Sequence, residues 1–130
     1  MITDKLLLFD VDGTLVNSGK EIDSYMIAAL KELKSLGYHI GIAGGGNIDK
    51  ILYQMKNEIF FHHYFSECGC VYYKNMLNEK LALEKVYEKN IRKHELYHYI
   101  NILIKKALEF LSKVDYTITG NFIDLRTGII

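Results

Sequence analysis

The sequence predicts an α/β protein in which a parallel sheet comes first and a smaller α+β unit follows. Two observations predict the sheet. Apolar strand-like runs alternate with amphipathic helical stretches in the first half of the 130 residues, and acidic or glycine-rich stretches directly follow two of those runs. A third observation predicts the second unit, because the pattern changes near residue 78. We therefore expect a core over 1–78 and a separate unit over 79–130.

The elements of the core follow from apolar periodicity and from the residues that begin and end helices. In chain order they are strand 5–9, helix 22–36, strand 38–43, helix 48–57, strand 63–65 and strand 70–73. Asp23 and Asn47 are suited to cap the two helices, and Gly37 to follow the first in a left-handed conformation. This alternation is typical of parallel strands joined by right-handed crossovers.

The second unit begins with a charged stretch and contains one strong helix. The Glu- and Lys-rich residues 79–93 are most simply a solvated face, whereas residues 94–112 carry apolar and tyrosine side chains at the helical spacing typical of core packing. Strands are expected at 116–119 and 122–126, on either side of a break at Gly120 and Asn121. A helix followed by two strands predicts a partial α+β domain.

Composition excludes several functional classes. Sixteen basic and sixteen acidic residues cancel, which argues against nucleic acid or a membrane surface as a partner. The longest apolar runs fall far short of the roughly 18–20 residues that span a bilayer. Two cysteines without a secretory context indicate a reducing compartment, so cytoplasmic localisation is expected.

Two aspartates mark the candidate reaction centre. Asp10 and Asp12 follow the first strand directly, and side chains two apart on extended backbone point the same way. Two carboxylates would repel each other there unless a cation or a phosphoryl group lay between them. A solvated acidic turn is the alternative. Ligands of parallel sheets bind beyond the carboxyl ends of the strands, where these aspartates and the glycines 44–46 are both expected.

The residues around these positions resemble a known family. Asp10-Val11-Asp12-Gly13-Thr14 after an apolar strand resembles motif I of the haloacid dehalogenase superfamily. A closer resemblance, to the eukaryotic-type phosphomannomutases, rests on four blocks in order: residues 8–15, 40–45, 65–74 and 122–128. It implies part of a haloacid dehalogenase-like Rossmannoid core, followed by the start of an α+β cap domain.

The resemblance also implies a reaction. Family members interconvert mannose 6-phosphate and mannose 1-phosphate, a step that supplies GDP-mannose, with Mg²⁺ and a sugar bisphosphate activator. Asp10 would be the nucleophile that becomes phosphorylated, Asp12 the general acid/base, and both would help bind Mg²⁺. The expected phosphate-binding residues are Gly44, Gly45, Gly46, Asn47, Lys20 and Arg126.

Three departures from the family pattern leave alternatives open. Gly46 stands where the family has a phosphate-binding serine, and Gly19 with Lys20 stands where it has an arginine. The family also continues well past the block at Arg126, so the resemblance covers its N-terminal part, with the first strand at an open sheet edge. The alternatives to a mutase are a non-catalytic remnant or assembly partner of a split mutase, and a sugar-phosphate phosphatase. The expected partners are a hexose phosphate, and either a second copy through the cap or a complementing C-terminal chain.

Overall fold

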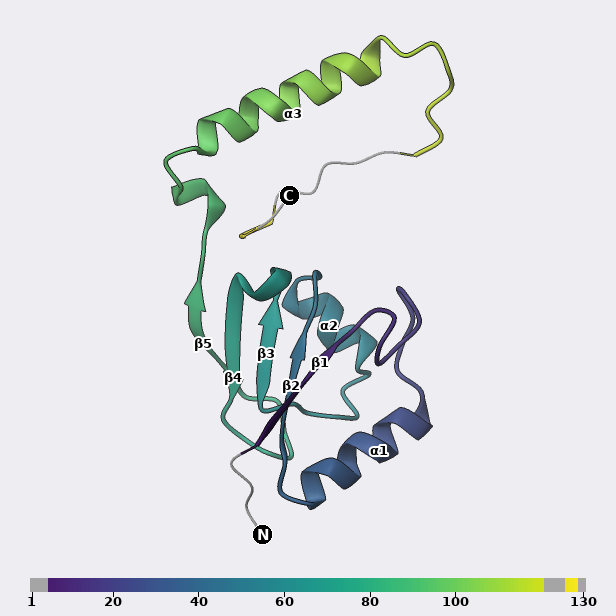
Figure 1. Cartoon of the computed structure of the whole chain (residues 1–130), viewed down its shortest axis with the longest axis vertical. Coiled ribbons are helices and arrows are strands. Elements are labelled where there is room, and N and C mark those ends of the chain that lie inside the picture. Colours follow the sequence, from purple (N-terminus) through teal and green to yellow (C-terminus); the bar gives the residue numbers. More distant parts are fainter. Residues whose placement is uncertain (1–4, 121–125, 129–130) are drawn as a thin grey trace.

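The structure is a computed structural model that describes residues 5–120 and 126–128. Within these ranges a five-stranded sheet has the strand order β1-β2-β3-β4-β5 (Figure 1). In chain order the elements are β1 (Leu6–Asp10), α1 (Ser24–Ser35), β2 (His39–Ala43), α2 (Ile48–Gln54), β3 (His63–Ser66), the 3₁₀ turn η1 (Glu67–Gly69), β4 (Val71–Asn75), β5 (Leu83–Glu88), the 3₁₀ turn η2 (Ile91–Lys93) and α3 (Tyr97–Ser112).

The predicted α/β core is confirmed. β1, β2 and β3 are parallel, while β4 and β5 add antiparallel pairs. The short η1 turn explains the reversal, because a parallel connection needs a crossover of a dozen or more residues. The capping predictions also hold: Asp23 and Asn47 accept hydrogen bonds from Met26 N and Lys50 N, and Gly37 has a φ of 85°.

The hydrophobic core lies between one face of the sheet and the two helices that follow β1 and β2. Ile40 and Ile42 of β2 and Tyr64 of β3 are completely buried there. They pack with Ile27 and Leu30 of α1 and Ile51 and Met55 of α2. This packing fixes α2 against the sheet, so that its first turn lies at the carboxyl ends of the parallel strands. As expected from the sequence, β1 lies at an edge of the described sheet.

The stretch predicted as a solvated face contains a strand. β5 pairs antiparallel with β4, and its side chains are largely exposed, so the charges are solvated but the backbone is not a loop. The buried Asn75 holds this hairpin: its side chain donates to Leu77 O and Lys80 O and accepts from Ala82 N. The sheet therefore continues past residue 78, and the division into two domains stays a prediction.

The predicted long helix forms, but two expectations about its surroundings are wrong. α3 begins at Tyr97, three residues later than the predicted 94, and none of its residues is buried; Leu103 and Phe110 are 66% and 67% exposed. The helix extends away from the sheet (Figure 1), so its apolar spacing is not used for core packing in the described chain. Residues 116–119 form no strand, and most of the strand expected at 122–126 lies outside the described residues. None of the described helices is long and apolar enough to cross a membrane.

Candidate active site

A tight turn after β1 places the two aspartates at one end of the sheet. Asp10 is the last residue of β1 and pairs in register with Ala43 at the end of β2. The buried Val11 then anchors the turn, because its carbonyl oxygen accepts hydrogen bonds from the backbone amides of residues 14–16. Gly13 adopts a φ of 79°, which favours glycine, and its N–H donates to Val16 O at 2.7 Å. Backbone geometry therefore explains the glycine of the motif.

Asp10 carries an accessible carboxylate. The residue is exposed, and the Thr14 hydroxyl donates to its Oδ2 at 3.4 Å. A nucleophile has to reach the reacting phosphorus directly, and an exposed carboxylate at the end of a rigid strand meets that requirement. The threonine of the motif orients this carboxylate.

Asp12 lies in a more elaborate environment. Its Oδ1 accepts hydrogen bonds from Gly19 N and from Gln54 Nε2, both at 2.9 Å, and its Oδ2 lies 4.0 Å from Lys50 Nζ. The bond from Gly19, then that from Gln54, lowers the pKa of Asp12, and Lys50 acts in the same direction. These contacts keep the carboxylate ionised and oriented. Because 37% of the side chain is exposed, it is still open to a ligand.

Two α2 residues that contact Asp12 were not predicted from the sequence. Lys50 and Gln54 are four residues apart and share one helix face, next to the core positions Ile51 and Met55. Gln54 is only 2% exposed and also donates to Lys20 O at 3.2 Å, so it joins the loop after motif I to the site. The signal available in the sequence was Gln54, a polar residue at a core-spaced position of the helix that follows the glycines.

The glycine-rich loop between β2 and α2 lies beside the motif I turn. Gly44 N donates to Phe65 O at 3.0 Å, and a Cβ at Gly44 would lie only 3.0 Å from Val11 Cγ2. At Gly46 a Cβ would approach the Lys50 side chain, which occupies the space of the missing serine side chain. The Asn47 side-chain oxygen is engaged as the cap of α2 at 3.0 Å from Lys50 N.

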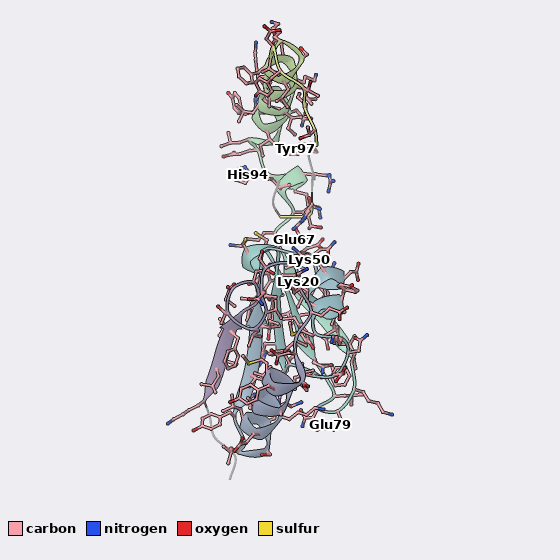
Figure 2. All side chains as sticks on the ribbon, turned by 90° about the vertical axis from the view of Figure 1, so that its right-hand side faces the viewer. Lys20, Lys50, Glu67, Glu79, His94 and Tyr97 are labelled. Atoms are coloured by element: carbon pink, nitrogen blue, oxygen red, sulfur yellow. The ribbon has the colours of Figure 1, made fainter. Side chains whose placement is uncertain are left out.

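The structure brings most of the predicted site residues to one end of the core. Arg126 reaches the glycine loop, where its Nη1 donates to Gly45 O at 2.7 Å. Figure 2 shows Lys20, Lys50 and Glu67 at this same end and Glu79 at the opposite end. The Lys20 side chain is exposed there, and no contact ties it to either aspartate in the described part of the chain.

The donor set at the two aspartates fits a hard cation. Mg²⁺ takes oxygen ligands and usually binds through one or two carboxylates while keeping several waters. Asp10 offers an accessible carboxylate, and Asp12 retains Oδ2 as a second oxygen beside Lys50. The described residues contain no group of three or more His, Cys, Asp or Glu suited to a metal ion. Further ligands would therefore be waters, phosphate oxygens or groups outside these residues.

Comparison with known proteins decides the family. The model of the haloacid dehalogenase-like hydrolase family matches residues 7–123. The chain belongs to this family. It is 31% identical over 128 residues to a phosphomannomutase of Spinacia oleracea and 33% identical over 130 residues to phosphomannomutase 1 of Mus musculus. These matches cover 96% of the chain but 48% and 47% of the relatives, so the chain spans about half their length.

Solved structures of haloacid dehalogenase-like proteins share the fold. A haloacid dehalogenase-like hydrolase from B. subtilis matches with a TM-score of 0.65 at 20% identity, over 79% of this chain and 34% of that one. A sugar phosphatase of haloacid dehalogenase subclass IIB matches with a TM-score of 0.58 at 27% identity, over 78% of this chain and 38% of that one. The predicted fold class and the predicted family resemblance are therefore confirmed.

Proposed function

We propose that this haloacid dehalogenase-like chain carries the phosphoryl-transfer centre of a phosphomannomutase-like enzyme, which interconverts mannose 6-phosphate and mannose 1-phosphate and so supplies GDP-mannose synthesis. One observation carries the proposal: an accessible Asp10 carboxylate stands beside an Asp12 carboxylate that Gly19, Gln54 and Lys50 hold in its ionised form. The identity to two phosphomannomutases over 96% of the chain supports the choice of reaction.

The two carboxylates have different roles in this proposal. Asp10 attacks the phosphorus of the bisphosphate activator; its Oδ–P bond forms as the bond from phosphorus to the sugar oxygen breaks, and the departing sugar oxygen takes up a proton from water. In the next half-reaction a sugar hydroxyl attacks the aspartyl phosphate, and Asp12 takes the hydroxyl proton. The hydrogen bonds from Gly19 and Gln54, which lower the pKa of Asp12, keep the residue deprotonated before the sugar arrives, as a base has to be.

The remaining residues bind and orient phosphate. Bound at Asp10 and Asp12, Mg²⁺ would offset the repulsion between the carboxylates and the phosphoryl oxygens. Backbone amides of residues 44–46 approach a phosphate closely because no side chain intervenes. The Arg126 guanidinium would grip the non-reacting phosphate in a bidentate manner, exchanging Gly45 O for phosphate oxygens. The exposed Lys20 would add positive charge at the same end.

The activity of the whole enzyme requires more than the described chain offers. The chain matches about half of each curated relative, and β1 presents an open edge next to Asp10. We propose that a C-terminal polypeptide, carrying what the second half of the relatives contributes, completes the site. A second copy bound through the α3 region is the other proposed partner. Cytoplasmic localisation remains a prediction.

Phosphorus NMR tests the proposal directly. The protein is incubated with mannose 1-phosphate, Mg²⁺ and a hexose bisphosphate, alone and with the C-terminal half of a relative as a separate polypeptide. Formation of mannose 6-phosphate in either arm, lost in Asp10→Asn, supports the proposal. If neither arm forms it and no inorganic phosphate is released, the result would favour a non-catalytic remnant.

A sugar-phosphate phosphatase is the second candidate. The exposed Asp10 leaves an aspartyl phosphate open to water, and one structural neighbour at 27% identity is described as a sugar phosphatase. In the same spectra, release of inorganic phosphate without isomerisation would favour this function over the mutase.

A further inference from the structure

Residues 126–128 lie against the core at a point far away in the sequence. Four hydrogen bonds hold the contact: Arg126 Nη1 donates to Gly45 O at 2.7 Å, Gly128 N to Glu67 Oε2 at 2.6 Å, Ile91 N to Thr127 O at 2.7 Å, and Cys70 Sγ to Gly128 O at 3.8 Å. This segment comes after α3, yet it returns to the end of the core that carries the aspartates (Figure 1). The contact therefore decides where Arg126 is held.

Glu67 is an unusual residue at this contact. Its side chain is buried, with 6% of the residue exposed, although a carboxylate is stable out of water only when it is well hydrogen-bonded. Its φ of 51° is a left-handed conformation that a glutamate rarely adopts. The bond from Gly128 N gives Oε2 of this carboxylate a donor, and a backbone amide that donates to a carboxylate makes a strong, charge-assisted hydrogen bond.

The loop around Glu67 is bonded to the glycine loop in turn. Glu67 N donates to Gly46 O at 2.9 Å, and Cys68 N donates to Gly44 O at 3.0 Å. A continuous path of hydrogen bonds thus runs from the glycine loop through Glu67 to Gly128. Glu67 therefore contacts the glycine loop through its backbone and the 126–128 segment through its side chain.

Gly128 is required at its own position. An added Cβ would collide with Cys70 Cβ and would lie 3.2 Å from Lys89 O. Two independent features therefore contribute to the docked position, an acceptor at residue 67 and the absence of a side chain at residue 128. Each can be removed without altering Asp10, Asp12 or Arg126.

We propose that Glu67 is a positioning residue, which anchors the Gly128 amide and so holds the Arg126 guanidinium over the glycine loop for a sugar phosphate. The proposal rests on the proposed function for its ligand, but the anchor itself is independent of any activity. Glu67 contacts no substrate in this scheme and acts only through Arg126.

Two readouts on the 130-residue chain test the proposal. The first is the amide exchange rate of Gly128, followed by NMR without ligand in the wild type, Glu67→Ala, Glu67→Gln and Gly128→Ala. We expect protection in the wild type, exchange faster by about tenfold or more in Glu67→Ala, and partial rescue in Glu67→Gln, which keeps a neutral acceptor. In Gly128→Ala the amide of residue 128 should lose protection as well.

Matched controls are Glu84→Ala, at an exposed residue of β5, and Gly120→Ala, where a Cβ meets nothing within 4 Å.

The second readout is the dissociation constant for mannose 6-phosphate, measured by titration calorimetry. Glu67→Ala, Gly128→Ala and Arg126→Ala should each weaken binding by about tenfold, and Glu67→Ala combined with Arg126→Ala should weaken it no further than Arg126→Ala alone. Additive losses would overturn the proposal, because they would mean that Glu67 acts independently of Arg126. So would an unprotected Gly128 amide in the wild type. Protection that depends on Glu67, in a chain that does not bind mannose 6-phosphate even when the C-terminal half of a relative is added, would support the anchor and contradict the proposed function instead.

Discussion

The two faces of the sheet differ sharply in what covers them. On one face, Ile42 and Tyr64 are fully buried beneath α1 and α2. On the other, Leu6 and Leu8 of β1 are 48% and 55% exposed and lie over Gly41, where a Cβ would come within 3.0 Å of Leu8 Cδ1. Parallel strands are normally covered on both faces, so the covered face accounts for the stability of the fold and the open face leaves apolar surface in water.

The largest effect on stability should come from truncating a side chain on the covered face. Ile42→Ala removes a completely buried side chain and leaves a cavity, so the free energy of unfolding should fall by about 2–5 kcal/mol. Leu8→Ala, two strand positions from Asp10 on the open face, should change it by only about 0.5 kcal/mol. Urea denaturation of both variants measures the difference. Equal losses would contradict the contrast between the faces.

An intermediate effect is expected where the sheet is held by a side-chain network. Asn75→Ala removes three hydrogen bonds and leaves the backbone polar groups of Leu77, Lys80 and Ala82 without this partner. The free energy of unfolding should fall by about 1–3 kcal/mol. Asn101→Ala, at an exposed position of α3, is the matched control. Both are measured by urea denaturation, and an unchanged midpoint for Asn75→Ala would show that β5 does not depend on this network.

These elements also show which parts of the fold could be predicted from the sequence. Caps such as Asp23 and Asn47 were predictable because a cap bonds to amides two or three residues away. β5 was not, because its formation depends on the Asn75 network and on pairing with β4 rather than on its own pattern. The spacing of α3 predicted a helix, but spacing alone does not reveal whether a partner covers its apolar side.

The same distinction applies to the candidate site. Asp10 and Asp12 could be identified because a strand followed by two carboxylates is a local pattern. Lys50 and Gln54 could not be assigned to Asp12 without knowing how α2 packs against the turn after β1, since 38 and 42 residues separate them. Glu67 was hidden for the same reason, because its partner Gly128 lies 61 residues away.

A smaller, pH-dependent effect is expected at the other end of the sheet. His62 Nδ1 accepts a hydrogen bond from Ile40 N at 3.0 Å, and the His62 ring stacks on His39, with centroids 4.5 Å apart. Burial, with the nearby His39 and Lys34, lowers the pKa of His62; burial, with His39 and Lys74, lowers that of His63. Both groups therefore bind protons more weakly in the folded protein than in the unfolded chain, whose histidines titrate near about 6.5.

The sign of the pH dependence follows from this difference. The contribution of these histidines to stability is complete above about pH 6.5 and is lost as the pH falls from there through the lowered pKa values. Urea denaturation at pH 7.5 and 5.5 measures the loss. His62→Asn, which keeps an acceptor but does not titrate, should reduce it, whereas His98→Asn on the exposed surface of α3 should not. A loss of equal size in the wild type and in His62→Asn would rule out His62 as a source.

The smallest effect on stability, and the most direct test of the open face, is expected from Leu8→Lys. An exposed edge strand with apolar side chains promotes pairing with other chains, and a lysine on such an edge opposes it. The free energy of unfolding should change by only about 0.5 kcal/mol, because Leu8 is already half exposed. The average mass in sedimentation at high protein concentration should fall relative to the wild type.

Tyr25→Lys, at an 83% exposed position on α1, should leave that mass unchanged, since an isolated exposed aromatic side chain forms no such edge. If Leu8→Lys instead unfolds the chain, then Leu8 belongs to the core, and the contrast between the two faces is wrong.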